Sequence, residues 1–295
     1  MIDKYEHGTN NSPASVDETS SITVKRTHGL GNVLCLLPAL DCLANDGYQI
    51  TVITRPEWLY TFSTIRPKFT WTCDTDDDAI NLDELTCDLM PSEHRSDESG
   101  RLLGVPSPLP TKALRLNIPL SWSENFAALS GAIVFAPEGG HRSRYWPYCG
   151  ELGNALEGRN LVLVGLDDLP AINCQTDLRG QLQLHELFGL MAVASVVVTM
   201  DSAALHIAGA LKIATVAIFG GIDPKLRLRG DQQAVVLHGD VDCCPCNKNE
   251  TCHGSYHCIS AVTVKDVTNA IAIAPHTDNL VIRAVPALRR DTLAE

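Results

Sequence analysis

The sequence predicts an α/β protein with parallel sheets. Residues 196–198 are a run of valines, which suits a buried parallel strand. Residues 203–211 follow with small and apolar side chains of good helix propensity, and residues 215–219 form a second apolar strand segment. A strand, a helix and a strand in this order make a β-α-β unit. Its crossover is right-handed, and ligands bind at the carboxyl end of such sheets.

The composition of the chain limits the classes of function that it can have. The chain of 295 residues is long enough for two domains, and 45% of its residues are hydrophobic, as in globular proteins. The formal net charge of −12 argues against a broad surface for nucleic acid or anionic membrane, because those partners bind clustered Lys and Arg. No apolar run approaches the ~20 residues of a membrane span, and no signal-peptide core opens the chain. We therefore expect a cytoplasmic protein without a membrane span.

The first half of the chain repeats the same alternation. We expect a disordered tail over residues 1–20 and an amino-terminal Rossmann-like domain over residues 21–125. Strands are expected at residues 22–25 and 50–53, joined by a glycine-bearing turn and a helix with apolar residues at helical spacing. Pro38 predicts a bend or break in that helix, which should end at Gly47.

The second half is expected to form a carboxyl-terminal Rossmann-like domain over residues 130–275, entered through a linker around residues 120–131. Besides the central β-α-β unit it contains strand and helix segments at residues 132–135, 160–164, 184–194, 235–237 and 264–273. Residues 276–295 form a last segment, in which residues 280–282 are expected to return to the first domain.

The turn that opens the central helix is a candidate phosphate site. A helix N-terminus carries about half a positive charge and several unpaired N–H donors, so residues 200–203 can hold a phosphate without a lysine. Asp201 and Ser202 also carry side-chain oxygens that can cap the helix. Gly220 and Gly221 end the next strand, where backbone without Cβ atoms can turn sharply and approach a ligand. Any α/β protein has such turns, so the pattern alone leaves phosphate binding open.

Several motifs nevertheless occur together in a characteristic order. They are Gly29-Leu30-Gly31-Asn32-Val33-Leu34, Leu37-Pro38-Ala39-Leu40, Ala136-Pro137-Glu138-Gly139-Gly140, Arg144-Tyr145-Trp146-Pro147, Leu178-Arg179-Gly180, Asp201-Ser202-Ala203-Ala204-Leu205-His206 and Ala214-Thr215-Val216-Ala217-Ile218-Phe219-Gly220. With the segments between them, roughly residues 22–275, they resemble glycosyltransferase family 9, the ADP-heptose:lipopolysaccharide heptosyltransferase-like enzymes.

This resemblance implies the GT-B fold, in which two Rossmann-like domains face a cleft. It also implies transfer of a heptose-like sugar, with inversion, from a nucleoside diphosphate donor such as ADP-heptose. The loop with Gly29 and Gly31 corresponds to the acceptor side, and the segment from Asp201 corresponds to the donor site. The helix start at Ser202 and Ala203, together with a cation, can stabilise the departing diphosphate without a metal.

The resemblance also suggests which side chains bind the donor. Arg144 stands where the family has a basic residue before Trp-Pro, and its planar guanidinium suits two phosphate oxygens. Arg142 is the second choice. His206 is expected to support the loop, with direct phosphate contact as the alternative, while Asp201 is expected to cap the helix or orient the donor.

The expected general base is where this chain departs from the family pattern. The family places Asp after the glycine turn, but this chain has Asn32, whose amide cannot accept a proton as a base. We hypothesise that His28, in the same turn, takes the proton of the acceptor hydroxyl, because imidazole titrates near neutral pH. Glu138 is the second candidate.

Two polar stretches of the first half carry no core periodicity. Residues 91–112 are polar and proline-rich, which predicts a flexible segment and part of an acceptor lid. Residues 74–78 contain an Asp-Thr-Asp triplet, a pattern that binds a divalent metal in another class of sugar transferases. A solvated loop is the simpler interpretation of so short a motif.

Five of the eleven cysteines are clustered. Thiolates at this spacing can close a tetrahedral zinc or iron site, using four ligands or a set that includes Cys244, with His253 and His257 as spare ligands. The expected set is Cys243, Cys246, Cys252 and Cys258. Such an ion would be structural, and a local disulfide or packed free thiols are the alternatives.

Other functions remain open at this point. Because Asn32 replaces the expected base, the chain could be a catalytically silent nucleotide-sugar-binding protein. The cysteine segment could instead support a metal-stabilised oligomer or interaction module. The acceptor, whether a glycolipid, a protein or a small molecule, leaves no motif in the sequence.

Overall fold

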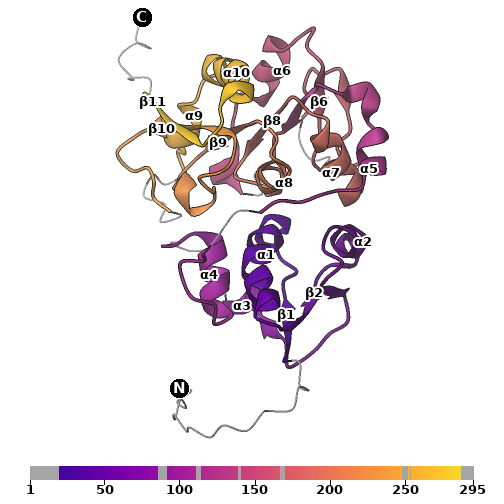
Figure 1. The fold of residues 1–295 in the computed structure, drawn as a ribbon. Helices are drawn as coiled ribbons and strands as arrows, with labels where there is room; N and C mark the ends of the chain where they lie inside the picture. The colour runs from indigo at the N-terminus through magenta and orange to yellow at the C-terminus, as the bar shows by residue number, and fades with distance from the viewer. Residues whose placement is uncertain are drawn as a thin grey trace, which may run out of the picture.

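The computed structural model describes residues 20–85, 92–110, 114–138, 141–166, 170–247, 252 and 254–286. Within them the chain forms two α/β lobes, each built on a parallel sheet, and Figure 1 shows one lobe above the other. The expected tail covers residues 1–20, of which residues 1–19 lie outside the described part.

The first lobe contains a four-stranded sheet of order β3-β2-β1-β4. Its strands are β1 (Ser21–Lys25), β2 (Gln49–Ile53), β3 (Thr70–Thr72) and β4 (Ile80–Asn81). Its helices are α1 (Leu30–Asn45), α2 (Pro56–Ile65), α3 (Leu82–Leu85) and α4 (Arg95–Leu102). Because all strands run parallel, the turns after β1 and β4 meet at the same edge of the sheet.

Helix α1 begins after Gly29, whose φ of 75° lies in the left-handed region that glycine adopts without strain. The predicted bend or break at Pro38 is wrong as a break, because α1 continues through this residue to Asn45. Proline removes one backbone hydrogen bond from the helix. Pro38 and the neighbouring side chains Leu36, Leu37 and Leu40 are buried, so packing of the helix compensates for that loss.

The predicted flexibility of residues 91–112 is wrong for residues 92–110, which the structure describes, while their part in an acceptor lid stays a prediction. They contain helix α4, which packs against α1. Polar side chains of α4 are buried, among them Arg95 and Asp97, and the Oδ1 of Asp97 accepts a hydrogen bond of 2.8 Å from the backbone N–H of Leu109. Burial of paired polar groups explains why this stretch lacks apolar periodicity.

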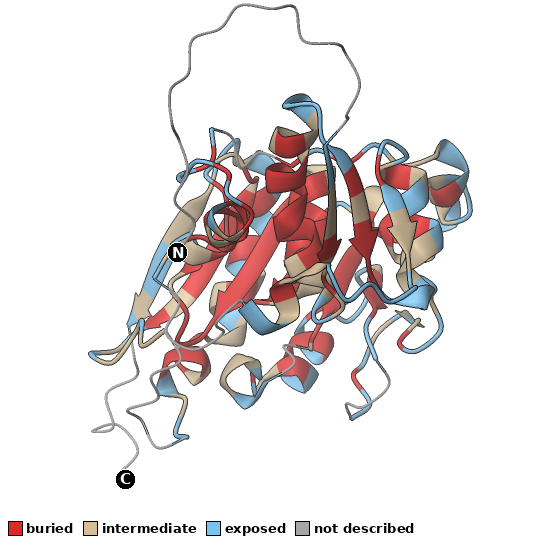
Figure 2. Ribbon diagram, turned by 90° about the horizontal axis from the view of Figure 1, so that it is seen from below, coloured by how far each residue is buried: buried red, intermediate tan, exposed pale blue. Residues whose placement is uncertain are grey.

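The second lobe contains a seven-stranded parallel sheet of order β11-β10-β9-β8-β5-β6-β7. Its strands are β5 (Ile133–Ala136), β6 (Leu161–Leu163), β7 (Thr176–Asp177), β8 (Val196–Met200), β9 (Thr215–Phe219), β10 (Ala234–Asp240) and β11 (Val281–Pro286). Its helices are α5 (Leu120–Glu124), α6 (Cys149–Ala155), α7 (Leu184–Ala192), α8 (Ala203–Leu211), α9 (His257–Ser260) and α10 (Val264–Ile273). The central strands are buried, as Figure 2 shows in red.

Two boundary expectations need correction. The expected linker at residues 120–131 folds as α5 and the 3-10 turn Ala127–Leu129, and α5 packs so closely on α7 that a Cβ at Gly189 would collide with the carbonyl oxygen of Trp122. The expected return of residues 280–282 to the first lobe is also wrong. Strand β11 pairs in parallel with β10 at the edge of the second sheet.

The two lobes share a hydrophobic core. Helix α1 of the first lobe packs against α8 of the second. One cluster of buried side chains includes Leu34 and Leu37 of α1 together with Ala204 and Ile207 of α8. This contact brings the turn after β1 close to the turn after β8. Among the described residues, no helix is both long and apolar enough to cross a bilayer.

Candidate active site

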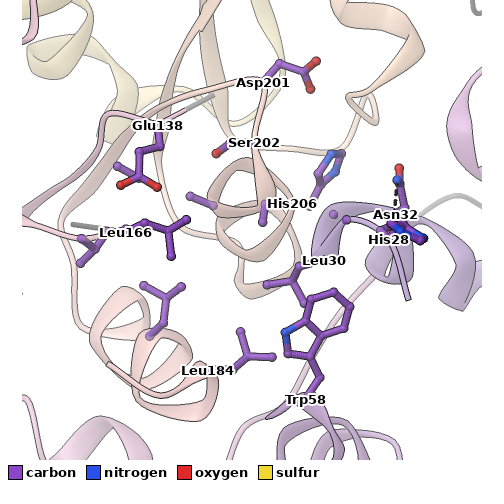
Figure 3. A pocket seen from close by; sticks show the side chains of 18 of the residues that line it. His28, Leu30, Asn32, Trp58, Glu138, Leu166, Leu184, Asp201, Ser202 and His206 are labelled. Atoms are coloured by element: carbon purple, nitrogen blue, oxygen red, sulfur yellow. Dashed lines mark hydrogen bonds between the residues drawn. The ribbon is translucent and has the colours of Figure 1, made fainter. Parts of the chain in front are cut away.

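A cavity of about 710 Å³ lies between the lobes. The turn after β1 and the start of α2 line it from the first lobe, and the ends of β5, β6 and β8 line it from the second. Figure 3 shows Glu138 and Leu166 on one side of α8, and His28 and Asn32 on the other. Leu30, Trp58 and Leu184 form an apolar part of its wall, so the cavity has a polar and an apolar region.

The N-terminus of α8 opens into this cavity, as the sequence predicts for the candidate phosphate site. Asp201, Ser202 and Ala203 line it. The prediction that Asp201 or Ser202 caps the helix is wrong, because no side chain caps this first turn. The hydroxyl of Ser202 instead forms a 2.9 Å hydrogen bond with that of Thr199. The turn therefore retains the N–H groups that bind an anion at a helix start.

The carboxylate of Asp201 pairs with two arginines. Its Oδ2 lies 3.3 Å from the Nε of Arg144 and 3.8 Å from the Nε of Arg227. Arg144 also donates a 3.0 Å hydrogen bond to the backbone carbonyl of Asp201. All three side chains are at the cavity. One carboxylate between two guanidiniums leaves this group with a net positive charge, as a diphosphate site requires.

Sequence reasoning missed Arg227 and Arg95, which both line the cavity. Burial lowers the pKa of Arg227, while Asp201 opposes that effect, so the group stays charged at neutral pH. Arg95 lies on α4 and pairs with Glu98 at 2.6 Å. A sequence signal for Arg227 was available in the basic run after Pro224, Lys225-Leu226-Arg227-Leu228-Arg229. No sequence signal pointed to Arg95, because its position depends on how α4 packs.

His206 lies between the lobes and lines the cavity. Its Nδ1 is 3.5 Å from the Sγ of Cys35 on α1. Burial lowers the pKa of His206 well below its ordinary value, and the nearby charges of Arg229 and Arg227 lower it further, so the ring is neutral at pH 7. A Cβ at Gly31 would lie 2.7 Å from the Cδ2 of His206, which explains why glycine occupies this position.

The two candidate bases, His28 and Glu138, lie at the cavity together with Asn32. The side chain of His28 is 76% exposed, and its Nδ1 lies 3.2 Å from the Oδ2 of Asp83. Asn32 donates a 3.1 Å hydrogen bond from Nδ2 to the carbonyl of His28, so its amide holds the turn together. Glu138 stands opposite, against Gly165, where a Cβ would lie 2.8 Å from its Oε1. Gly139 and Gly140 are outside the described residues.

Three residues expected at the donor site do not line this cavity. Arg142 opens into a separate cavity of about 510 Å³ with Tyr145 and Tyr256. A Cβ at Gly220 would collide with the carbonyl oxygen of Ser143, and one at Gly221 would lie 2.5 Å from the Sγ of Cys246. These glycines therefore allow neighbouring segments of the chain to pack closely, rather than a ligand to approach.

The cysteine segment is separate from the cavity between the lobes. In the part of the chain that the structure describes, no three His, Cys, Asp or Glu side chains form a group that could hold a metal. Residues 248–251 and His253 lie outside that part. Cys244 donates a 3.3 Å hydrogen bond to the carbonyl of Gly220. The described thiols thus do not fit the expected metal set.

Residues 74–78, which contain the Asp-Thr-Asp triplet, form an exposed loop.

Comparison with known proteins decides the family. The family model described as glycosyltransferase family 9 (heptosyltransferase) matches residues 102–257, which is more than half of the 295 residues. The chain belongs to glycosyltransferase family 9. Family membership makes it a transferase that acts on sugars. No curated protein matches the sequence.

Solved structures of similar fold agree with the assignment of this chain to family 9. It is similar to a family 9 glycosyltransferase from Veillonella parvula DSM 2008, with 16% identity, a TM-score of 0.68 and coverage of 90% of this chain and 99% of that one. The iron-containing dodecameric glycosyltransferase TibC from enterotoxigenic E. coli H10407 has 15% identity and a TM-score of 0.70, covering 89% and 78%. ADP-heptose lps heptosyltransferase II of E. coli has 16% identity and a TM-score of 0.59, covering 87% and 98%. The predicted GT-B fold, with two Rossmann-like domains facing a cleft, is confirmed.

Proposed function

We propose that this family 9 enzyme transfers a heptose-like sugar from an ADP-heptose-like donor to an acceptor hydroxyl, with inversion and without a metal in the chemical step. One observation carries the proposal. The uncapped N-terminus of α8 and the guanidiniums of Arg144 and Arg227 converge on the same cavity. A nucleoside diphosphate presents anionic oxygens, which helix N–H groups and arginine bind without an added cation.

In this proposal the acceptor oxygen attacks the anomeric carbon of the donor. The bond from that carbon to the diphosphate oxygen breaks, and the diphosphate leaves with the electron pair. Arg144, Arg227 and the start of α8 stabilise the charge that develops on the leaving oxygen. His28 takes the proton of the acceptor hydroxyl, and Glu138 across the cavity is the second candidate for this role.

ADP-heptose as donor is supported by the relatives. E. coli heptosyltransferase WaaC, with a TM-score of 0.54, was solved with ADP-2-deoxy-2-fluoro heptose, and TibC was solved with ADP-D-beta-D-heptose. At 15% identity these structures support the fold of this chain, while the donor stays our proposal.

A thermal-shift panel of ADP, UDP and GDP tests donor binding. A ligand at about a hundred times its dissociation constant adds about 2.7 kcal/mol to the free energy of unfolding. We expect ADP to stabilise the protein most. Equal shifts for all three nucleotides, or none, would contradict the proposed donor.

The alternative is a silent nucleotide-sugar-binding protein, which Asn32 in place of the family Asp favours. Release of ADP from ADP-heptose, with water as acceptor, distinguishes the enzyme from the silent binding protein. Turnover supports the enzyme, whereas ADP binding without turnover supports the silent protein.

The cysteine segment takes no part in the proposed chemistry. TibC is described as iron-containing and dodecameric, but the described residues of this chain form no group that could hold a metal, so we favour packed thiols over a zinc or iron ion on Cys243, Cys246, Cys252 and Cys258. Metal analysis of protein purified without chelator tests it. About one equivalent supports the ion, and its absence leaves packed thiols as the explanation. Size-exclusion chromatography would show whether this chain also assembles into an oligomer.

A further inference from the structure

A buried carboxylate stands directly behind the proposed base. β1 and β4 are neighbours in the first sheet, with Lys25 opposite Asn81. The residues that follow the two strands therefore meet at the carboxyl edge of the sheet. This topology brings Asp83 of α3 to His28, although 55 positions separate them in the sequence.

The carboxylate of Asp83 is held from several directions. Its Oδ2 accepts hydrogen bonds from the backbone N–H of Thr27 at 2.8 Å and from the hydroxyl of Thr27 at 2.7 Å. Its Oδ1 accepts one from the backbone N–H of His28 at 3.0 Å and lies 3.4 Å from the Nη1 of Arg26. Only 6% of the Asp83 side chain is exposed. A carboxylate so fixed cannot turn away from the imidazole beside it.

The imidazole of His28 has the opposite environment. Its Nδ1 faces the Oδ2 of Asp83 at 3.2 Å, while 76% of the side chain is exposed at the cavity. Arg55 also lies near this turn, where its Nε donates a 2.8 Å hydrogen bond to the carbonyl of Thr27. One edge of the ring is therefore anchored to a carboxylate, and the rest is accessible to an acceptor.

We propose that Asp83 is a positioning residue for His28, an inference that rests on the proposed function. The Nδ1–H of His28 donates a hydrogen bond to the carboxylate of Asp83. This hydrogen bond fixes the tautomer that has a lone pair on Nε2. When Nε2 takes the proton of the acceptor hydroxyl, the carboxylate stabilises the resulting imidazolium. This pair supplies the base that Asn32 cannot. Asp83 itself does not line the cavity.

A kinetic comparison separates this role from simple support of the turn. The readouts are ADP release from ADP-heptose and the Kd of ADP. We expect His28→Gln to lower kcat by about 10²- to 10⁴-fold. Asp83→Asn should lower kcat by at least about tenfold and leave the Kd of ADP within about twofold. Thr27→Val, which removes a hydrogen bond to the same carboxylate and a hydroxyl 3.4 Å from the Nδ1 of His28, is the matched control and should change kcat by less than about threefold.

The double variant His28→Gln/Asp83→Asn should be no slower than His28→Gln alone, because the two side chains act as one unit. Three results would overturn the role of Asp83. The first is a double variant whose loss of kcat is the product of the two single losses. The others are full activity of Asp83→Asn, and equal losses of kcat in Asp83→Asn and Thr27→Val. Full activity of His28→Gln would overturn the base assignment and this inference with it.

A measurement without substrate keeps the inference testable if the proposed function fails. In protein labelled with ¹⁵N-histidine, the His28 signals are those lost in His28→Gln. Their shifts should report a proton on Nδ1 above neutral pH in the wild type, and a mixture of tautomers in Asp83→Asn. A wild-type His28 protonated mainly on Nε2 would refute the positioning role. Absence of ADP release with a normal Nδ1 tautomer would refute only the proposed reaction.

Discussion

The Nδ1 of His206 lies 3.5 Å from the Sγ of Cys35 and connects α8 of one lobe to α1 of the other. Both side chains are buried, and burial raises the pKa of Cys35 as it lowers that of His206. The contact is therefore made by a neutral thiol and a neutral imidazole. It lies in the contact between α1 and α8, which holds the turn after β1 close to the N-terminus of α8.

The neutral state of His206 predicts a pH-dependent stability. Below about pH 6.5 the unfolded chain binds a proton at this residue, while the folded protein does not until its lower pKa is reached. The free energy of unfolding should therefore fall as pH falls, by up to about 1.4 kcal/mol per pH unit from this residue. Urea denaturation at pH 7.5, 6.5 and 5.5 measures it. His206→Gln should be less stable than wild type at pH 7.5, with a gap that narrows at pH 5.5, and a constant gap would contradict the prediction.

Gly31→Ala should destabilise the contact between the lobes. The new Cβ would lie 2.7 Å from the Cδ2 of His206, so the lobes must separate slightly or the ring must move. We expect a loss of about 1–3 kcal/mol in the free energy of unfolding, despite the better helix propensity of alanine. Gly150→Ala in α6, where a Cβ meets nothing within 4 Å, is the control and should be neutral or stabilising. Combining Gly31→Ala with His206→Ala should recover part of the loss, and no recovery would place the strain elsewhere.

Arg144 and Arg142 make a matched pair for donor binding, because they are two positions apart and only Arg144 lines the cavity between the lobes. Arg144→Gln should raise the Kd of ADP about 10- to 100-fold, as expected for loss of a charged hydrogen bond. Arg142→Gln should leave that Kd nearly unchanged. Isothermal titration calorimetry measures both, and equal effects would argue against the assigned position of the diphosphate.

Gly220→Ala should weaken ADP binding without altering the cavity wall directly. Its Cβ would collide with the carbonyl oxygen of Ser143 and displace the turn that carries Arg144. We expect a lower melting temperature and a higher Kd of ADP, consistent with an overpacking cost of about 1–3 kcal/mol. Gly230→Ala is the control, since a Cβ there meets nothing within 4 Å. Unchanged ADP affinity in Gly220→Ala would show that the turn tolerates displacement.

The sequence by itself determined the local elements and the turn before α8, which opens into the cavity. Apolar runs of residues 196–198 and 215–219, and the small residues between them, specify β8, α8 and β9, because strand and helix periodicity and propensity are properties of neighbouring residues. Gly29 likewise specifies the turn before α1, because φ of 75° favours glycine whatever surrounds it. The order of the motifs along the chain was enough to indicate the family.

Only the tertiary structure decided which side chains meet. Asp83 reaches His28 because β4 pairs beside β1, and Arg227 reaches Asp201 because the segment after β9 folds back over the start of α8. The predicted flexibility of residues 91–112 was wrong because paired polar groups are buried on α4. The predicted return of residues 280–282 to the first lobe was wrong because β11 pairs with β10. Strand order and the packing of helices depend on contacts between distant residues, which local periodicity does not encode.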